Sequence, residues 1–291
     1  MTELKGVGPA EPRDALEIRG EDRARFLHGY VTSDIKGLEI GRSCYTFFPT
    51  PQGKVRCDAI VLALEDHLWI DLPRGLGEPI AAHLAKYVIA DRVEIGEPQA
   101  MERRAIFGGE DLPQGAFRTA ADSRRGSPAV NVWARPERQL GLEAALAAQG
   151  LSLLTQHLLT VLRVEAGIAS FGVDFDDTRF PQETGAEADA VSYTKGCFIG
   201  QEPIVMARDR AGFVNRAFLL LKVDGDPLPP GTKLLRDGQE VGIATSSTVS
   251  PKFHSTVALG YIRRGHQDIG TKLEATLPDG HRAVEVLGLP K

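Results

Sequence analysis

Short apolar runs separated by turn residues fill the first half of the chain. Aromatic and β-branched side chains, which favour strands, dominate several of these runs. The strands that this pattern predicts are residues 44–48, 55–64, 67–72, 104–107 and 129–133. Residues 76–88 and 137–149 instead repeat their apolar positions at helical spacing. Strands followed by a helix, twice over, predict an α+β fold with antiparallel sheets.

From about residue 213 the pattern changes to short strands closed by tight turns. Asp224-Gly225 and Asp237-Gly238 are strong hairpin signals. The strands expected here are residues 217–223, 233–236, 240–246, 256–262, 272–277 and 283–287. Such a run predicts a small sandwich or barrel. We therefore expect a body over 1–212, with a second, interleaved lobe at about 45–150, and a C-terminal barrel over 213–291.

A helix expected from Ser152, its N-cap, to about Ala166 carries a carboxylate on its apolar side. At 100° per residue its apolar stripe consists of Leu154, Leu158, Val161 and Leu162. Glu165 falls inside that stripe, where a carboxylate must be paired or hydrogen-bonded. Either it reaches solvent or an arginine from the last turn, or it lines a pocket and accepts two donors from a flat, amide-like ligand edge.

Residues 170–200 show little periodicity, and long irregular segments in compact domains are usually functional or disordered. At their end, Lys195–Glu202 reads Lys-Gly-Cys-Phe-Ile-Gly-Gln-Glu and leads into a helix. Gly196 and Gly200 would let the backbone pass close to another group. The lysine and the helix N-terminus would both favour the thiolate of Cys197. The alternative is a tight turn that buries an inert cysteine.

Composition and charge narrow the class of protein. The chain has 291 residues, 42 % hydrophobic and 25 % charged, which is the balance of a folded globular protein. A formal net charge of −5 argues against direct binding of nucleic acid. No apolar run approaches the roughly 20 residues of a membrane span. Cys44, Cys57 and Cys197 fit neither a disulfide ladder nor a zinc motif, so we expect a reducing cytoplasm and no metal site.

Lys195–Glu202 closely resembles the Lys-Gly-Cys-Tyr-x-Gly-Gln-Glu signature of YgfZ-type proteins. These are the folate-binding iron–sulfur cluster maintenance proteins of the glycine cleavage T-protein (aminomethyltransferase) superfamily. Residues 163–168 resemble the Arg-x-Glu-x-Gly stretch of that superfamily. The other segments that resemble it are residues 26–35, 50–54, 171–178 and 181–183.

This resemblance implies a three-lobed ring of ferredoxin-like antiparallel α/β lobes plus a small C-terminal β-barrel, around a central tetrahydrofolate pocket. It implies that Glu165 holds the pterin ring and that Cys197 is exposed near the pocket. The folate contacts that it suggests are Arg163, Glu165, Gly196, Gly200, Gln201 and Glu202. The expected partners are a reduced folate and iron–sulfur client enzymes, with no direct nucleic-acid or membrane binding, and we expect a monomer.

The strand after Gly53 departs from the superfamily pattern. Members that transfer aminomethyl groups carry a paired Asp-Asp there, whereas this chain has Cys57-Asp58 and so retains one acid. The candidate catalytic residues are Cys197, Lys195 and Asp58. The leading hypothesis is a tetrahydrofolate-binding protein that supports assembly or repair of iron–sulfur clusters through the Cys197 thiol. The alternatives are a folate-dependent aminomethyltransferase or demethylase using Asp58, and a folate sensor that does not need the thiol.

Overall fold

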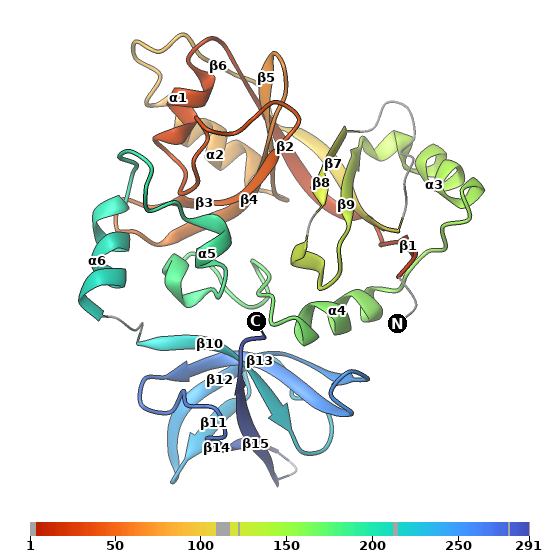
Figure 1. The fold of residues 1–291 in the computed structure, drawn as a ribbon, viewed down its shortest axis with the longest axis vertical. Coiled ribbons are helices and arrows are strands. Elements are labelled where there is room, and N and C mark those ends of the chain that lie inside the picture. Colours follow the sequence, from red (N-terminus) through yellow and green to blue (C-terminus); the bar gives the residue numbers. More distant parts are fainter. Residues whose placement is uncertain (1–3, 109–116, 122, 212–214, 279, 291) are drawn as a thin grey trace.

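The computed structural model describes residues 4–108, 117–121, 123–211, 215–278 and 280–290. Figure 1 shows three lobes: β3–β5 with α1 and α2, then β7–β9 with α3, and a barrel below them. The helix α4 (Gln156–Glu165) lies between the upper lobes and the barrel. The predicted α+β fold with antiparallel lobes and a small C-terminal barrel is confirmed.

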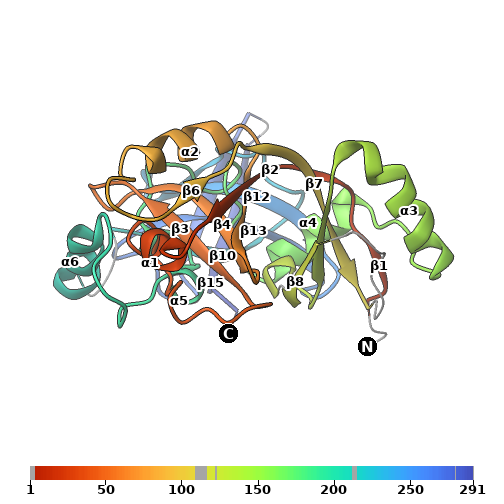
Figure 2. The same ribbon diagram turned by 90° about the horizontal axis from the view of Figure 1, so that it is seen from above.

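One antiparallel sheet runs through both upper lobes. Its strand order is β3-β4-β5-β2-β7-β9-β8, with β1 paired to β7 and β6 paired to β2. The strands are β1 (Gly6–Val7), β2 (Glu11–Arg19), β3 (Ser43–Pro49), β4 (Val55–Ala63), β5 (His67–Pro73), β6 (Glu94–Ile95), β7 (Gln99–Phe107), β8 (Phe117–Ala121) and β9 (Val130–Ala134). All five strands predicted in this region are present. The central strand β2 joins the two halves because it pairs with β5 and with β7 (Figure 2).

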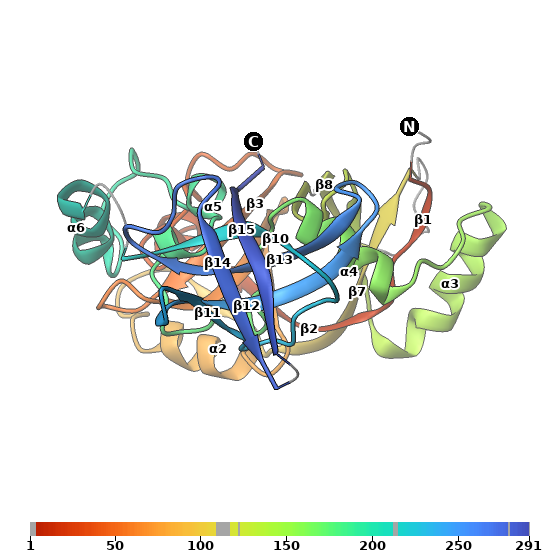
Figure 3. The same ribbon diagram turned by 90° about the horizontal axis from the view of Figure 1, so that it is seen from below.

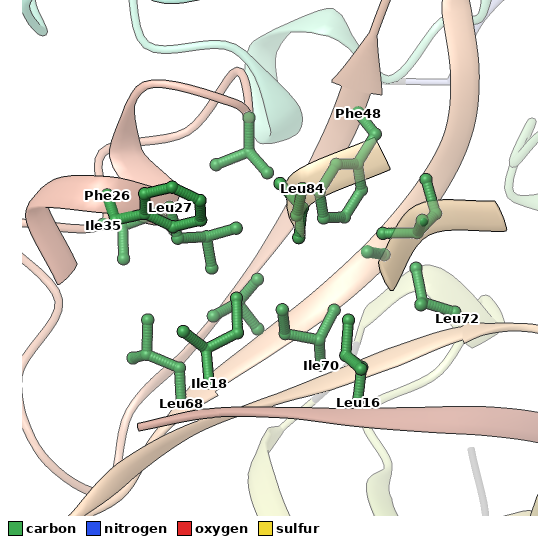
Figure 4. Packing of buried hydrophobic residues seen from close by; sticks show 14 of the residues in the cluster. Leu16, Ile18, Phe26, Leu27, Ile35, Phe48, Leu68, Ile70, Leu72 and Leu84 are labelled. Atoms are coloured by element: carbon green, nitrogen blue, oxygen red, sulfur yellow. The ribbon is translucent and has the colours of Figure 1, made fainter. Parts of the chain in front are cut away.

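A hydrophobic core separates the sheet from α1 (Arg23–His28) and α2 (Gly77–Ala85). Figure 4 shows side chains of this core, among them Leu16, Ile18, Phe26, Leu27, Ile70 and Leu84. Cys57 of β4 belongs to the same core and is fully buried. Because successive side chains of a strand point to opposite faces, Asp58 faces away from this core, toward α4 and the barrel.

The helix α4 begins later than the sequence predicts. Residues 152–154 are not helical, because this stretch runs extended beside β1: the N–H of Val7 donates to the carbonyl of Ser152 and the N–H of Leu154 to that of Val7. The N-cap is therefore Thr155, whose hydroxyl accepts from the N–H of Leu158 at 3.1 Å, and the expected cap at Ser152 is wrong. The residues that α4 buries are Leu159, Val161, Val164 and Glu165, a stripe rotated from the expected one.

Residues 170–200 are largely irregular, as predicted, with only the 3₁₀ turn Pro181–Glu183 and α5 (Glu187–Ala190) among them. The remaining helices are α3 (Gln139–Ala148), α6 (Gln201–Ala211) and the 3₁₀ turns Ser123–Arg125 and Pro136–Arg138. Within the described ranges, we find no helix whose length and apolar character would let it cross a membrane.

The C-terminal part is a closed barrel with the strand order β10-β13-β12-β11-β14-β15. Its strands are β10 (Arg216–Val223), β11 (Lys233–Arg236), β12 (Gln239–Ser250), β13 (Ser255–Arg263), β14 (Lys272–Leu277) and β15 (Gly280–Gly288). Seen from below, β12 and β13 lie against α4 (Figure 3). The expected boundary after residue 212 falls in residues 212–214, outside the described residues.

Candidate functional site

A cavity of about 370 Å³ lies between the body sheet, α4 and the barrel. Its polar lining comes from six helices and strands and from the 3₁₀ turn at 123–125. The side chains that matter below are Glu11 and Arg13 of β2, Tyr45 of β3, Asp58 of β4, Arg103 of β7, Arg124 and Arg125, Arg163 of α4, and Thr245 and Ser246 of β12. The cavity is therefore assembled from residues far apart in the chain.

Asp58 is the acid of this cavity. Its Oδ2 accepts a hydrogen bond from the hydroxyl of Tyr45 at 2.9 Å. Burial, followed by the charge of Asp58, raises the pKa of Tyr45 well above its usual value, so the phenol stays a hydrogen-bond donor. The guanidinium of Arg124 stacks on Tyr45, and its central carbon lies 3.7 Å from the centre of the Tyr45 ring. Tyr45 and Arg124 thus fix the orientation of the Asp58 carboxylate.

A network of arginines and acids forms one wall of the cavity. Glu11 accepts from both Arg103 and Arg125. Burial raises the pKa of Glu11, but these two guanidinium groups outweigh it and hold the pKa well below its usual range. Asp71, fully buried beneath the wall, accepts from Arg13 at 2.8 Å and from Arg103 at 2.6 Å. The wall therefore keeps several cations in place at neutral pH.

Arg163, a predicted folate contact, ties α4 to the barrel and also lines the cavity. It donates to the carbonyl of Ile168 and to the hydroxyl of Ser246, both at 2.8 Å, and to the buried carboxylate of Asp174. Asp174 also accepts from Thr245 and Ser246 of the barrel. The guanidinium is thus engaged by the protein, and we assign Arg163 a positioning role at this junction.

Glu165 is buried, as its position in the apolar stripe requires, but it is not among the residues that line the cavity. Its Oε1 accepts from the hydroxyl of Ser250 and from the N–H of Lys252, the latter at 3.0 Å. Both donors belong to the barrel, so neither of the two alternatives from the sequence describes this contact. Among the described residues, Oε2 has no hydrogen-bond partner.

Cys197 is exposed, and it lies in a different hollow from Asp58. This second hollow, which we call the thiol groove, has a volume of about 480 Å³. The other residues that line it are Arg25, Phe26, Gly29, Tyr30, Tyr87, Asp91, Phe198 and Ile199. Arg25 and Phe26 belong to α1, so the groove lies on the helix-covered side of the sheet. The alternative of a buried cysteine is therefore wrong.

Among the described residues, no hydrogen bond joins Lys195 to Cys197. Its buried ammonium donates to the carbonyls of His28 and Val31 at 2.6 Å and of Ser33 at 2.8 Å. Burial lowers the pKa of Lys195 to about 8, which still leaves the group protonated at neutral pH. All three of its protons are therefore used to hold the loop that precedes β3.

The two glycines of the octapeptide have different roles. Gly200 has φ +74°, and a Cβ there would lie 2.2 Å from the carbonyl oxygen of Thr50. Gly196 has no such constraint, since the nearest atom to a Cβ would be Nε2 of His28 at 3.8 Å. Gly200 thus lets the start of α6 pack on the Thr50–Gly53 turn. Neither glycine lines the cavity, and neither do Gln201, which is half-buried, nor Glu202, which is exposed.

We expect Gly200→Ala to destabilise the protein by at least about 1–2 kcal/mol, because a side chain there needs a left-handed backbone and collides with the Thr50 carbonyl. Gly196→Ala, four residues earlier in the same signature, should change stability by less than about 0.5 kcal/mol. Urea denaturation of both variants measures the difference. Equal unfolding free energies for the two variants would contradict the assigned role of Gly200.

Comparison with known proteins finds a family match over the barrel and similar proteins over most of the chain. Residues 215–291 match the family described as "Glycine cleavage T-protein C-terminal barrel domain". An aminomethyltransferase of Rippkaea orientalis is 26 % identical over 89 % of this chain and 79 % of its own length. A putative chloroplastic transferase of Arabidopsis thaliana is 25 % identical over 88 % of this chain and 64 % of its own. The family match thus covers the barrel, whereas the similarity to aminomethyltransferases extends over most of the chain.

A solved structure has the same fold. The glycine cleavage system aminomethyltransferase T from Bartonella henselae superposes with a TM-score of 0.84 at 20 % sequence identity. The match covers 99 % of this chain and 87 % of that one. The shared fold thus extends over the body as well as the barrel.

Most of the polar cavity residues escaped prediction from the sequence, among them Tyr45, Arg13 and Arg124. Tyr45 had a usable signal, because it lies on a predicted strand beside β4 and could be placed once the pairing was known. Arg13 and Arg124 had none. Arginines are common on surfaces, and only the strand order brings these two to the acid on β4.

Proposed function

We propose that this protein binds tetrahydrofolate at the central cavity and that Asp58 serves a one-carbon transfer there. The observation that carries this proposal is the Asp58 carboxylate, held by Tyr45 inside the cavity between sheet, α4 and barrel. A general acid or electrostatic stabiliser must lie within hydrogen-bond reach of the reacting nitrogen. The aminomethyltransferases among the relatives support the same class of reaction.

The strand register supports this proposal despite the missing second acid. Cys57, where aminomethyl-transferring members carry an acid, is fully buried in the helix-side core. Asp58 is on the opposite face, which is the one that lines the cavity. The acid that this chain retains is therefore the one that can meet a ligand, and an aminomethyltransferase-like reaction is chemically open to it.

Glu165 remains our candidate for the pterin ring, with two changes. It does not line the cavity, so the pterin would have to extend beyond the cavity to reach it. Since Oε1 is engaged by Ser250 and Lys252, only Oε2 is left to accept from the pterin. Calorimetric titration with tetrahydrofolate tests the whole proposal. We expect binding by the wild type and weaker binding by Glu165→Ala. Ser250→Ala is the control: it removes the contact between Glu165 and the barrel but keeps the carboxylate, and so separates the loss of a ligand contact from a loosened barrel. Absence of binding by the wild type would refute the folate assignment.

A second function is favoured by the exposed thiol. We propose that Cys197 supports assembly or repair of iron–sulfur clusters in client enzymes, as in the YgfZ-type proteins whose octapeptide this chain resembles. The exposure of Cys197 in the thiol groove, on the other side of the sheet from Asp58, is the observation in its favour. The thiol then acts on a partner at this surface, and folate binding and thiol chemistry use separate parts of the molecule.

Substitution of Cys197 by Ala tests the second function. In cells lacking this protein, the variant should fail to restore iron–sulfur enzyme activity while its affinity for tetrahydrofolate stays within about twofold. Cys44→Ala is the matched control, because burial raises the pKa of Cys44 to about 12 and makes that thiol unreactive. Full restoration by Cys197→Ala would refute the thiol role. Folate binding with neither thiol dependence nor turnover would identify a folate sensor instead.

A further inference from the structure

Two polar groups that line the cavity keep unused hydrogen-bonding capacity. The Oδ1 of Asp58 is buried and has no partner among the described residues, whereas Oδ2 is bound by Tyr45. On Arg13, Nε donates to Asp71, but the two terminal amino groups make no hydrogen bond with the described residues. A buried acceptor without a donor costs about 1–3 kcal/mol, so Oδ1 of Asp58 is suited to a ligand that brings an N–H.

The sheet register places these two groups on one face and in one row. Ile60 of β4, Asp71 of β5 and Ala15 of β2 lie opposite one another across three adjacent strands. Two residues further along each strand, the same register places Asp58 of β4, Pro73 of β5 and Arg13 of β2 in the next row on the same face. Their backbones are two strand spacings apart, about 10 Å, and both side chains reach into the same cavity.

The chemistry of the two groups is complementary to one class of ligand. Asp58 offers an anionic acceptor, and Arg13 offers a planar pair of donors that fits a carboxylate. Arg124, stacked on Tyr45, adds positive charge on the same side. A small molecule with an ammonium group next to a carboxylate is an α-amino acid.

We propose that the cavity contains a subsite for an α-amino acid, with its amino group on Oδ1 of Asp58 and its carboxylate on Arg13. The inference rests on the proposed function, because it names the amine that would sit beside the folate. It concerns binding alone. An N-methylated amino acid satisfies the same contacts, since a secondary ammonium group still presents an N–H to Asp58.

The same chemistry exists in folate itself, whose glutamyl tail carries an N–H and carboxylates. Calorimetry with tetrahydrofolate and with tetrahydropteroate, which lacks the glutamate, distinguishes the two sources. If Arg13 serves a free amino acid, Arg13→Lys leaves the affinities for both pterins unchanged. If that variant weakens tetrahydrofolate alone, Arg13 holds the glutamyl tail and the inference is wrong.

The main experiment titrates the full-length protein with glycine, N-methylglycine and methylamine, with and without tetrahydrofolate. We expect both amino acids to bind, and Arg13→Lys to weaken them at least about tenfold, since an ammonium cannot form the two-donor contact. Methylamine lacks a carboxylate and should bind weakly and be insensitive to the change. Arg13→Lys keeps a cation beside Asp71, and thermal unfolding of the variant checks that the fold is intact.

Arg19→Lys is the matched control, because Arg19 lies on the same strand but pairs with Glu17 and Asp66 at the surface. It should bind the amino acids as the wild type does. A wild type that binds tetrahydrofolate but neither amino acid would refute this inference and leave the proposed function standing. A wild type that binds the amino acids but not tetrahydrofolate would refute the proposed function and retain the subsite.

Discussion

Asp58→Asn is expected to slow one-carbon transfer by at least about 100-fold while leaving the affinity for tetrahydrofolate within about threefold. Asparagine keeps the shape of the side chain, and its carbonyl oxygen can still accept from Tyr45. What it removes is the negative charge and the ability to exchange a proton with the reacting amine. The loss should therefore appear in the rate and not in folate binding.

The assay follows methylenetetrahydrofolate and ammonia from an aminomethyl thioether and tetrahydrofolate. In this redox-neutral transfer the carbon leaves sulfur and the amine nitrogen and becomes bonded to N5 and N10 of the folate, releasing a thiol. Asp66→Asn, in the exposed turn between β4 and β5, is the control and should match the wild type. Equal rates for Asp58→Asn and the wild type would remove Asp58 from the reaction.

The position of Asp58 could be predicted from the sequence only in part. A strand was expected over 55–64 and is found at Val55–Ala63, and alternation along it puts Cys57 and Asp58 on opposite faces. Which face is the core, however, depends on the neighbours of β4. The sheet is centred on β2, which lies one strand beyond β5 from β4. The apolar run of β2 is short and lies between charged residues, so that the central strand of the sheet did not stand out from the sequence.

Long-range pairing explains why the rest of the site was missed. Arg13 and Asp58 are 45 residues apart, and they meet because β5 lies between their strands and pairs with both. Local patterns carry no information about that order. The same limitation affected α4, where competition from β1 for residues 152–154 moved the helix start to Gln156 and rotated its buried face. Glu165 was correctly expected to be buried, but its partners come from a barrel turn more than 80 residues away.

The octapeptide illustrates the opposite case, in which a local motif is recognisable but its physical roles are not. Exposure of Cys197 follows from the resemblance and is found in the structure. The lysine, in contrast, was expected to favour the thiolate, and its ammonium is instead directed at three backbone carbonyls. A motif that looks like one chemical unit therefore divides into an exposed thiol, a backbone anchor and a packing glycine.

Lys195→Met should lower the free energy of unfolding by about 2–4 kcal/mol. Methionine fills a similar volume but leaves the carbonyls of His28, Val31 and Ser33 without their shared donor in a buried setting. Each buried carbonyl left unpaired costs about 1–3 kcal/mol. Part of this loss is offset, because the variant no longer buries a charge. The cost of burying that charge is evident in the pKa of Lys195, which burial lowers to about 8.

The effect should extend to the thiol groove. The loop that Lys195 anchors also accepts the N–H of Ile199 on the carbonyl of Gly29, and Gly29 lines the groove beside Cys197. We therefore expect Lys195→Met to increase the rate at which a thiol reagent modifies Cys197, in addition to lowering stability. Lys222→Met, at an exposed position of β10, is the control for both measurements. Urea denaturation gives the free energy of unfolding of both variants. If the two values differ by less than about 0.5 kcal/mol, the three carbonyl contacts do not anchor this loop.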